Sequence, residues 1–247
     1  MINGFEEFYN LKDKNLIKDD YCIAETEKVV CKALRSNHEV EKIIATQEFY
    51  DANKELIDQN CKHVLIKDKK ELEEITGFKL HHGILAKVRT NGLKKIDELG
   101  DKILIFNGVT SPENVGTMTR AAMAFGFDNI IYDAKSASPY LRRCIRVSMG
   151  NAFEANICKS LNIIEDISLL QQLGYSVCAT ANEEGALPIT DFKYPQKVAL
   201  IIGNEGNGMD REVIDACDKK LFIPITNYVA HLNAASAASI FLYHSIF

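Results

Sequence analysis

The chain has 247 residues and a mass of 27.7 kDa, enough for one large domain or two ordinary ones with buried cores. Apolar residues make up 47% and charged residues 26% of it, which excludes a disordered, collagen-like or low-complexity protein. The net charge of −5 is unlike the strongly basic balance of many nucleic-acid binders, so any such contact must come from local patches.

Short apolar strands alternate with amphipathic helices over the first 90 residues. The spacing predicts a helix that begins near Glu25, strands over 40–44, 63–66 and 83–88, and a helical turn over 71–75 that stops at Gly77. A polar segment over 90–100, with a glycine near each end, predicts a linker. We therefore expect a small α/β domain at the N-terminal end.

A more regular pattern follows the linker. Apolar runs predict strands over 103–106, 129–132, 175–179, 198–202 and 221–225, and helical spacing predicts helices over 114–125, 163–173, 210–217 and 232–247. Strands that are almost entirely apolar and alternate with helices indicate an α/β domain whose parallel sheet is covered on both faces.

Two sequence features bear on the cellular setting. The seven cysteines lack the C-x-x-C spacing of zinc and redox sites, so we expect reduced, buried thiols and no metal. Apolar stretches are much shorter than the ~20 residues of a membrane span, and the first residues do not resemble a secretory signal. We expect a cytoplasmic protein with no membrane partner.

Three segments could carry chemistry, each placed after a predicted strand, where open parallel sheets bind ligands. In the first, residues 107–120, the start of a helix can attract anions and Arg120 follows Asn114 by six residues. From the residues alone, a helix start capped by Ser111 or Asn114, with a solvated arginine, is an equally good interpretation.

The second segment, residues 202–210, has three glycines in six residues, so its backbone turns sharply or approaches a ligand closely. It matches neither the P-loop nor the dinucleotide fingerprint, and Glu205 at its crest is a candidate acid, base or acceptor. The third segment, residues 222–239, ends a strand at Pro224 and enters a helix of small residues. A flexible loop and an ordinary buried helix remain the alternatives for these two segments.

One local basic cluster stands out in the C-terminal part of the chain. Arg142, Arg143 and Arg146 lie within five residues, and arginine is the usual side chain for reading phosphate. The cluster is a candidate phosphate contact, with a solvated helix face as the commoner alternative, and the family resemblance given next implies that the phosphate belongs to RNA.

In this order and spacing, the segments closely resemble the SpoU–TrmH family of RNA ribose 2′-O-methyltransferases, within the knotted methyltransferase superfamily. The resemblance covers residues 101–247 and is carried by Pro112-x-Asn114-x-Gly116-x3-Arg120, by Ile202-Gly-Asn-Glu205-Gly-x-Gly-Met, and by Ile223-Pro-Ile225 with Leu232-Asn233. Residues 24–30 and 82–86 resemble, less specifically, the ribosomal-protein-like substrate domain that precedes the catalytic domain in many members.

The resemblance implies a substrate (RNA)-binding domain over 1–92 and a SpoU-type domain over 100–247 that ends in a deep trefoil knot. It implies that S-adenosylmethionine binds in that knot and that the protein is a homodimer. The residues it assigns to the cofactor are Thr180, Gly203, Asn204, Gly208, Ile223 and Leu232.

The implied reaction is methyl transfer to a ribose 2′-hydroxyl, in ribosomal RNA rather than transfer RNA because of the extra N-terminal domain. Arg120 would bind the adjacent phosphate and stabilise the developing alkoxide, Asn114 and Asn233 would hold the arginine and the ribose, and Glu205 would orient the loop. His231 and Ala235 occupy positions where family members often have serine.

Three alternatives remain open from the sequence. The first is a catalytically silent knotted RNA-binding protein, which the departure at His231 keeps open. The second is the same chemistry on transfer RNA. The third, a dinucleotide-binding oxidoreductase, is disfavoured because the glycine fingerprint is missing.

Overall fold

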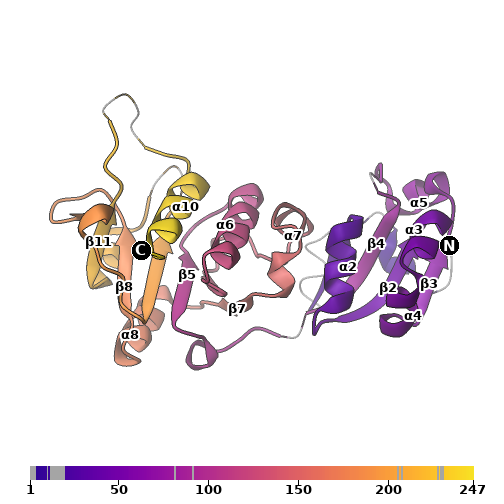
Figure 1. The fold of residues 1–247 in the computed structure, drawn as a ribbon, viewed down its shortest axis with the longest axis horizontal. Coiled ribbons are helices and arrows are strands. Elements are labelled where there is room, and N and C mark those ends of the chain that lie inside the picture. The colour runs from indigo at the N-terminus through magenta and orange to yellow at the C-terminus, as the bar shows by residue number, and fades with distance from the viewer. Residues whose placement is uncertain are drawn as a thin grey trace. The chain divides into compact units, whose positions relative to one another are not determined.

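The computed structural model describes residues 4–9, 11, 20–80, 82–90, 92–204, 206, 208–226, 228 and 231–247. The chain divides into two compact units (Figure 1). One contains residues 1–92 together with 140–154, and the other contains residues 93–139 and 155–247.

The first unit is built on a mixed four-stranded sheet in the order β1-β4-β2-β3, with β4 antiparallel to both neighbours and β2 parallel to β3. Its strands are β1 (Tyr21–Glu25), β2 (Glu39–Ala45), β3 (His63–Ile66) and β4 (Ile84–Arg89). Its helices are η1 (Glu6–Phe8), α2 (Glu27–Arg35), α3 (Gln47–Ala52), α4 (Lys54–Asn60), α5 (Lys69–Thr76), α7 (Arg142–Val147) and η4 (Asn151–Phe153).

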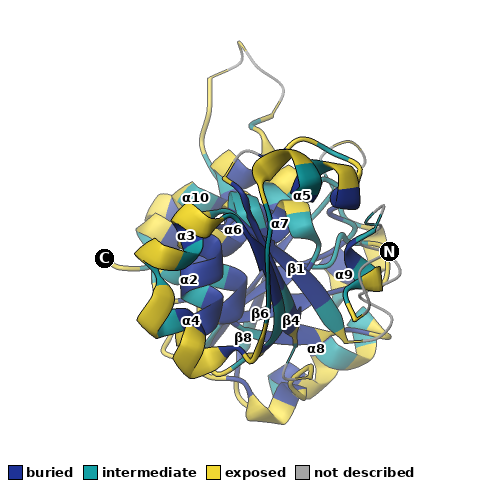
Figure 2. Ribbon diagram, turned by 90° about the vertical axis from the view of Figure 1, so that its right-hand side faces the viewer, coloured by how far each residue is buried: buried dark blue, intermediate teal, exposed yellow. Residues whose placement is uncertain are grey.

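Burial in this unit follows the amphipathic patterns of its sequence. Helix α2 buries Val29, Val30 and Leu34, and Phe8 of η1 is fully buried in a second cluster with apolar residues of the sheet and α5. Figure 2 shows the dark, buried strands and the exposed outer faces of α3 and α4. The prediction of a helix from Glu25 was wrong by two residues, because β1, which ends at Glu25, pairs with β4.

The second unit contains a seven-stranded sheet in the order β7-β6-β5-β10-β8-β11-β9, and every neighbouring pair is parallel. Its strands are β5 (Lys102–Phe106), β6 (Asn129–Tyr132), β7 (Asn156–Lys159), β8 (Ser176–Thr180), β9 (Leu187–Pro188), β10 (Val198–Ile202) and β11 (Lys219–Phe222). With the mixed sheet of the first unit, this confirms the α/β class, including a parallel C-terminal sheet.

Helices cover both faces of this sheet: η3 (Ile96–Glu98), α6 (Pro112–Ala124), α8 (Ile163–Gln172), η5 (Ile189–Asp191), α9 (Arg211–Ala216) and α10 (Ala234–His244). Side chains from α8 and α9 pack with Ile103 and Ile105 in one buried cluster. Because strand side chains alternate between faces, Leu104 and Phe106 point to the opposite face, where α6 and α10 pack against each other.

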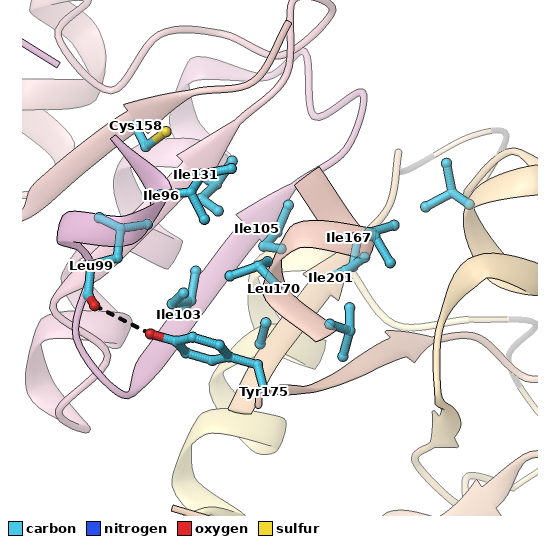
Figure 3. Close-up of a cluster of buried hydrophobic side chains, with 13 residues drawn as sticks. Ile96, Leu99, Ile103, Ile105, Ile131, Cys158, Ile167, Leu170, Tyr175 and Ile201 are labelled. Carbon is cyan, nitrogen blue, oxygen red and sulfur yellow. Dashed lines mark hydrogen bonds between the residues drawn. The ribbon is translucent and has the colours of Figure 1, made fainter. Parts of the chain in front are cut away.

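Two predicted boundaries differ from the structure. The predicted linker is partly core, because Ile96 and Leu99 are buried and the Tyr175 hydroxyl donates to the carbonyl oxygen of Leu99 at 3.2 Å (Figure 3). The last predicted strand, 221–225, begins and ends earlier, at β11. Pro224 lacks the N–H that would continue the ladder.

The segment over 140–154 packs with the N-terminal residues, although it lies far along the chain. Arg146 Nη1 lies 3.6 Å from the carboxylate of Glu25 at the end of β1, and Lys32 of α2 lies 2.9 Å from Glu154. The His38 ring contacts the ring of Phe153 at 5.4 Å between centroids. Residues 140–154 therefore belong to the first compact unit, while the domain assignment 1–92 and 100–247 stays a prediction.

Two further expectations concern the chain path and the membrane. The expected trefoil knot involves segments around residues 205, 207, 227, 229 and 230, which lie outside the described residues, and it stays a prediction. No helix among the described residues is long and apolar enough to cross a bilayer, since even α6 has only 13 residues.

Limited trypsin digestion tests the domain assignment. Lys94 and Lys95 are exposed, whereas Ile96 is buried, so we expect the first cut between residues 94 and 96. Because residues 140–154 pack with the N-terminal residues, the two fragments should co-elute in native size-exclusion chromatography and separate only in denaturant. A first cut inside α6, after Arg120, or fragments that separate without denaturant, would contradict this.

Candidate functional site

A cavity of about 430 Å³ opens in the second unit at the carboxyl ends of β10, β8 and β11, which are neighbours in the sheet. The residues directly after these strands form its walls, and α10 closes one side through Ala234, Ala237 and Phe241. All six residues predicted to bind the cofactor line this one cavity: Thr180, Gly203, Asn204, Gly208, Ile223 and Leu232.

The loop after β10 is folded back on itself. The backbones of Asn204 and Gly208 exchange two hydrogen bonds of 3.2 and 3.1 Å, and Gly208 has a φ of +70°. A Cβ added to Gly203 would lie 2.6 Å from Cγ of Met209 and 3.0 Å from the carbonyl carbon of Gly208, so only glycine fits there. The predicted catalytic Glu205 lies outside the described residues.

Polar side chains fix the cavity wall after β8. The Thr180 hydroxyl donates to the Ile201 carbonyl at 2.8 Å and ties the ends of β8 and β10 together. The Glu183 carboxylate lies 2.7 Å from Arg211 Nη1 and 3.8 Å from Lys220 Nζ. Sequence reasoning missed Glu183, although its place just after a strand in a parallel sheet could have identified it.

The other three predicted catalytic residues lie on α6 or at the start of α10, beside the cavity, and are not among its lining residues. Ser111 caps α6 by accepting from the backbone N–H of Asn114 at 3.3 Å, and Asn233 caps α10. The Asn233 side chain also donates to Asn114 Oδ1 at 3.2 Å, which joins the first and third motifs. Arg120 is exposed on α6, two turns after Asn114.

The three predicted RNA contacts have different surroundings in the first unit. The half-buried Arg142 guanidinium stacks over the ring of Phe78 at 4.2 Å, and Arg146 pairs with the buried Glu25. Arg143 is exposed. Of these three arginines, only Arg143 therefore lies fully at the surface.

Within the described part of the chain, no cluster of three or more His, Cys, Asp or Glu side chains could hold a metal ion.

Two family models match the chain. The model described as the SpoU rRNA Methylase family matches residues 101–243, which is more than half of the chain. The model described as RNA 2′-O ribose methyltransferase substrate binding matches residues 27–92.

Two curated relatives are named as 23S rRNA methyltransferases. The chain is 33% identical over 187 residues to the 23S rRNA (guanosine-2′-O-)-methyltransferase RlmB of Ralstonia nicotianae, with 72% of this chain and 74% of the relative covered. It is 32% identical over 143 residues to the 23S rRNA (guanosine(2553)-2′-O)-methyltransferase RlmP of Bacillus subtilis. That match covers 58% of this chain and 57% of the relative, so the chain spans just over half of it.

Solved structures share the fold. An AdoMet-bound rRNA methyltransferase from Sinorhizobium meliloti matches with a TM-score of 0.87 and 21% identity over 99% of this chain and 95% of that one. A putative RNA methyltransferase of the TrmH family from Porphyromonas gingivalis matches with a TM-score of 0.85 and 18% identity over 99% and 98%. The resemblance drawn from the three motifs is confirmed, and the chain belongs to the SpoU rRNA methylase family, with that family's substrate-binding domain ahead of the SpoU domain.

Proposed function

We propose that this protein transfers the methyl group of S-adenosylmethionine to a ribose 2′-hydroxyl of ribosomal RNA. The observation that carries the proposal is the meeting of Gly203, Asn204, Ile223 and Leu232, from the second and third motifs, in one cavity beside α6, which bears the first. The substrate-binding domain and the ribosomal RNA named for relatives support this RNA over transfer RNA.

The cavity suits S-adenosylmethionine in size and chemistry. Its volume falls within the ~300–1,000 Å³ of small-molecule sites. Leu221, Phe222 and Phe241 supply apolar wall for a flat base, and the tight turn after Gly203 brings backbone close to a ligand. Glu183 adds a carboxylate that suits a ligand with a cationic centre.

The chain's own residues must make a poor nucleophile reactive. When bound, S-adenosylmethionine supplies a methyl group on a sulfonium, and that chemistry needs no metal. Arg120 would bind a phosphate beside the target ribose and stabilise the alkoxide as the hydroxyl proton leaves to solvent, since a guanidinium stays protonated and is a poor base. Asn114 and Asn233, joined by a hydrogen bond, would hold the ribose and the arginine.

Substitution of Arg120 tests this mechanism. Arg120→Ala should lower methyl transfer from tritiated S-adenosylmethionine to ribosomal RNA by roughly 100-fold or more, because the developing charge loses its partner. Arg120→Lys should recover little, since an ammonium cannot reproduce the planar fork. Cofactor affinity, measured by isothermal titration, should stay within about twofold, because Arg120 does not line the cavity.

Lys102 supplies the control for this series, since it is a cation at the other end of β5, away from the motif loops. Lys102→Ala should keep both rate and affinity. An Arg120→Ala protein with the parental rate would refute the mechanism. A parent chain that binds the cofactor but methylates neither ribosomal nor transfer RNA would favour the silent RNA-binding alternative.

For RNA contact we propose Arg143 as the phosphate-binding member of the predicted arginine cluster. Arg143→Ala should lower the slope of log K against log salt for RNA binding by roughly one unit. Arg142→Ala is the matched comparison. It removes the stack on Phe78, so it should lower the melting temperature with a smaller change in slope. Equal slopes for the parent and Arg143→Ala would exclude this contact.

We also propose a homodimer that uses the exposed face of α10 and the residues after it. Tyr243, Ile246 and Phe247 are 51%, 52% and 86% exposed, and the Tyr243 ring makes edge-to-face contacts with the rings of Phe125 and Phe247. The small residues of α10 are largely buried within the chain, where α10 packs on α6. The contact surface we propose is therefore the aromatic end of this segment, Tyr243, Ile246 and Phe247, an apolar patch that favours association.

Light scattering at micromolar concentration should give a mass near twice 27.7 kDa. Tyr243→Asp should shift it toward the monomer, because a charge would be buried in the interface. Leu161 is 88% exposed outside this patch, so Leu161→Asp should leave the mass unchanged. A parent chain that is monomeric at this concentration would end the proposal.

We place the protein in the cytoplasm, where thiols stay reduced. All seven cysteines are free, and six are buried. Burial raises the pKa of the Cys178 thiol to about 11, so this side chain stays protonated and unreactive at neutral pH.

A further inference from the structure

Asp133, the residue that follows β6, is a buried carboxylate with no place in the mechanism above. It is 7% exposed and does not line the cavity. One of its oxygens accepts from Asn107 Nδ2 at 2.9 Å and from the backbone N–H of Gly108 at 3.0 Å. The other accepts from the backbone N–H and the hydroxyl of Ser136, at 2.8 and 2.7 Å. Asp133 therefore satisfies four donors from two loops.

These contacts fix the turn that follows β5. Gly108 has a φ of +71°, in the left-handed region that glycine adopts readily and other residues rarely do. The Ser136 hydroxyl accepts from the Val109 N–H at 3.0 Å, and the Ala137 N–H donates to the Val109 carbonyl at 2.9 Å. The segment 133–137 thus holds the backbone of 108–109 in place.

The same turn is joined to the cavity from its other side. The Asn204 side chain donates to the Gly108 carbonyl at 2.7 Å while its backbone pairs with Gly208. Strands β6, β5 and β10 are neighbours in the sheet, so their three carboxyl-end loops lie in a row. A continuous series of hydrogen bonds runs from Asp133 through Gly108 to Asn204, which lines the cavity.

We propose that Asp133 is a positioning residue for cofactor binding, which sets the place of Asn204 and the loop after β10 through Gly108. The proposal rests on the proposed function for the identity of the ligand. A carboxylate suits this place because three of the four groups it meets are N–H groups, which can only donate. An asparagine would turn its NH₂ toward one pair of the four and so set a donor against at least one of these N–H groups, which is costly.

The test compares two isosteric exchanges at opposite ends of β6. Asp133→Asn acts at the carboxyl end. Asn129→Asp is the matched control, since Asn129 is equally buried and its side-chain NH₂ donates to the Lys102 carbonyl at 3.1 Å, far from the motif loops. Both variants lose buried hydrogen bonds, so both should melt below the parent.

Only Asp133→Asn should weaken binding of S-adenosylmethionine, by roughly tenfold in isothermal titration. In the free protein, hydrogen exchange should quicken in peptides that cover 106–111 and 203–209 in this variant alone. Ser136→Ala, which removes one hydroxyl from the same loop, should give a smaller effect and serves if Asp133→Asn fails to fold.

A double-mutant cycle with Asn204→Asp tests the route. Asn204→Asp keeps the acceptor for Gly206 but loses the donor to Gly108. Asp133→Asn should then lower the affinity for S-adenosylmethionine much less in the Asn204→Asp background than in the parent chain.

Unchanged affinity in Asp133→Asn, additive effects in the cycle, or equal losses of affinity in Asp133→Asn and Asn129→Asp would overturn the proposal. So would quickened exchange over 106–111 without any over 203–209. A parent chain that does not bind S-adenosylmethionine would instead refute the proposed function, and the exchange experiment would still decide the role of Asp133.

Discussion

The position of the candidate cofactor cavity depends on the parallel pairing of β10 with β5 on one side and β8 on the other. All five residues of β10, Val198–Ile202, are buried, and they align with Lys102–Phe106 and with Ser176–Ala179. Because the strands run in one direction, every loop that begins at their ends emerges at one edge of the sheet. Segments almost 100 residues apart in the sequence, around Gly108 and Asn204, therefore come within hydrogen-bonding distance.

This constraint explains what the sequence could predict. Four of the five predicted C-terminal strands fall within a residue or so of the structure, because buried parallel strands are continuous apolar runs with clear ends. The six predicted cofactor residues came from the family resemblance, and they line one cavity because Thr180 ends β8 and the other five lie in the loops that follow β10 and β11. The short strands β1, β7 and β9 were missed, since two to five residues with mixed flanks carry little periodic signal.

What the sequence could not predict is set by tertiary contacts. The sequence over 142–146 does not show that its arginines differ. In the structure Arg142 stacks on Phe78, which lies far earlier in the chain, whereas Arg143 is exposed. Asp133 has no neighbours in the sequence that mark it, because its partners Asn107 and Gly108 lie 26 and 25 residues away. Such residues become visible only when the loops are seen side by side.

Tertiary contacts also explain how a chain with a net negative charge can belong to a family that acts on RNA. Such a chain can bind a polyanion if its own carboxylates form ion pairs within the protein. In the first unit, Glu7 and Glu41 are paired with Lys42 and Lys87, and desolvation at Lys87 is outweighed by these partners, which raise the pKa of its ammonium group. Beside the cavity, the first and third motifs meet through two amides, Asn114 and Asn233. In the proposed mechanism a carboxylate at either position would add negative charge beside the RNA phosphate, whereas amides can orient a ribose without adding charge.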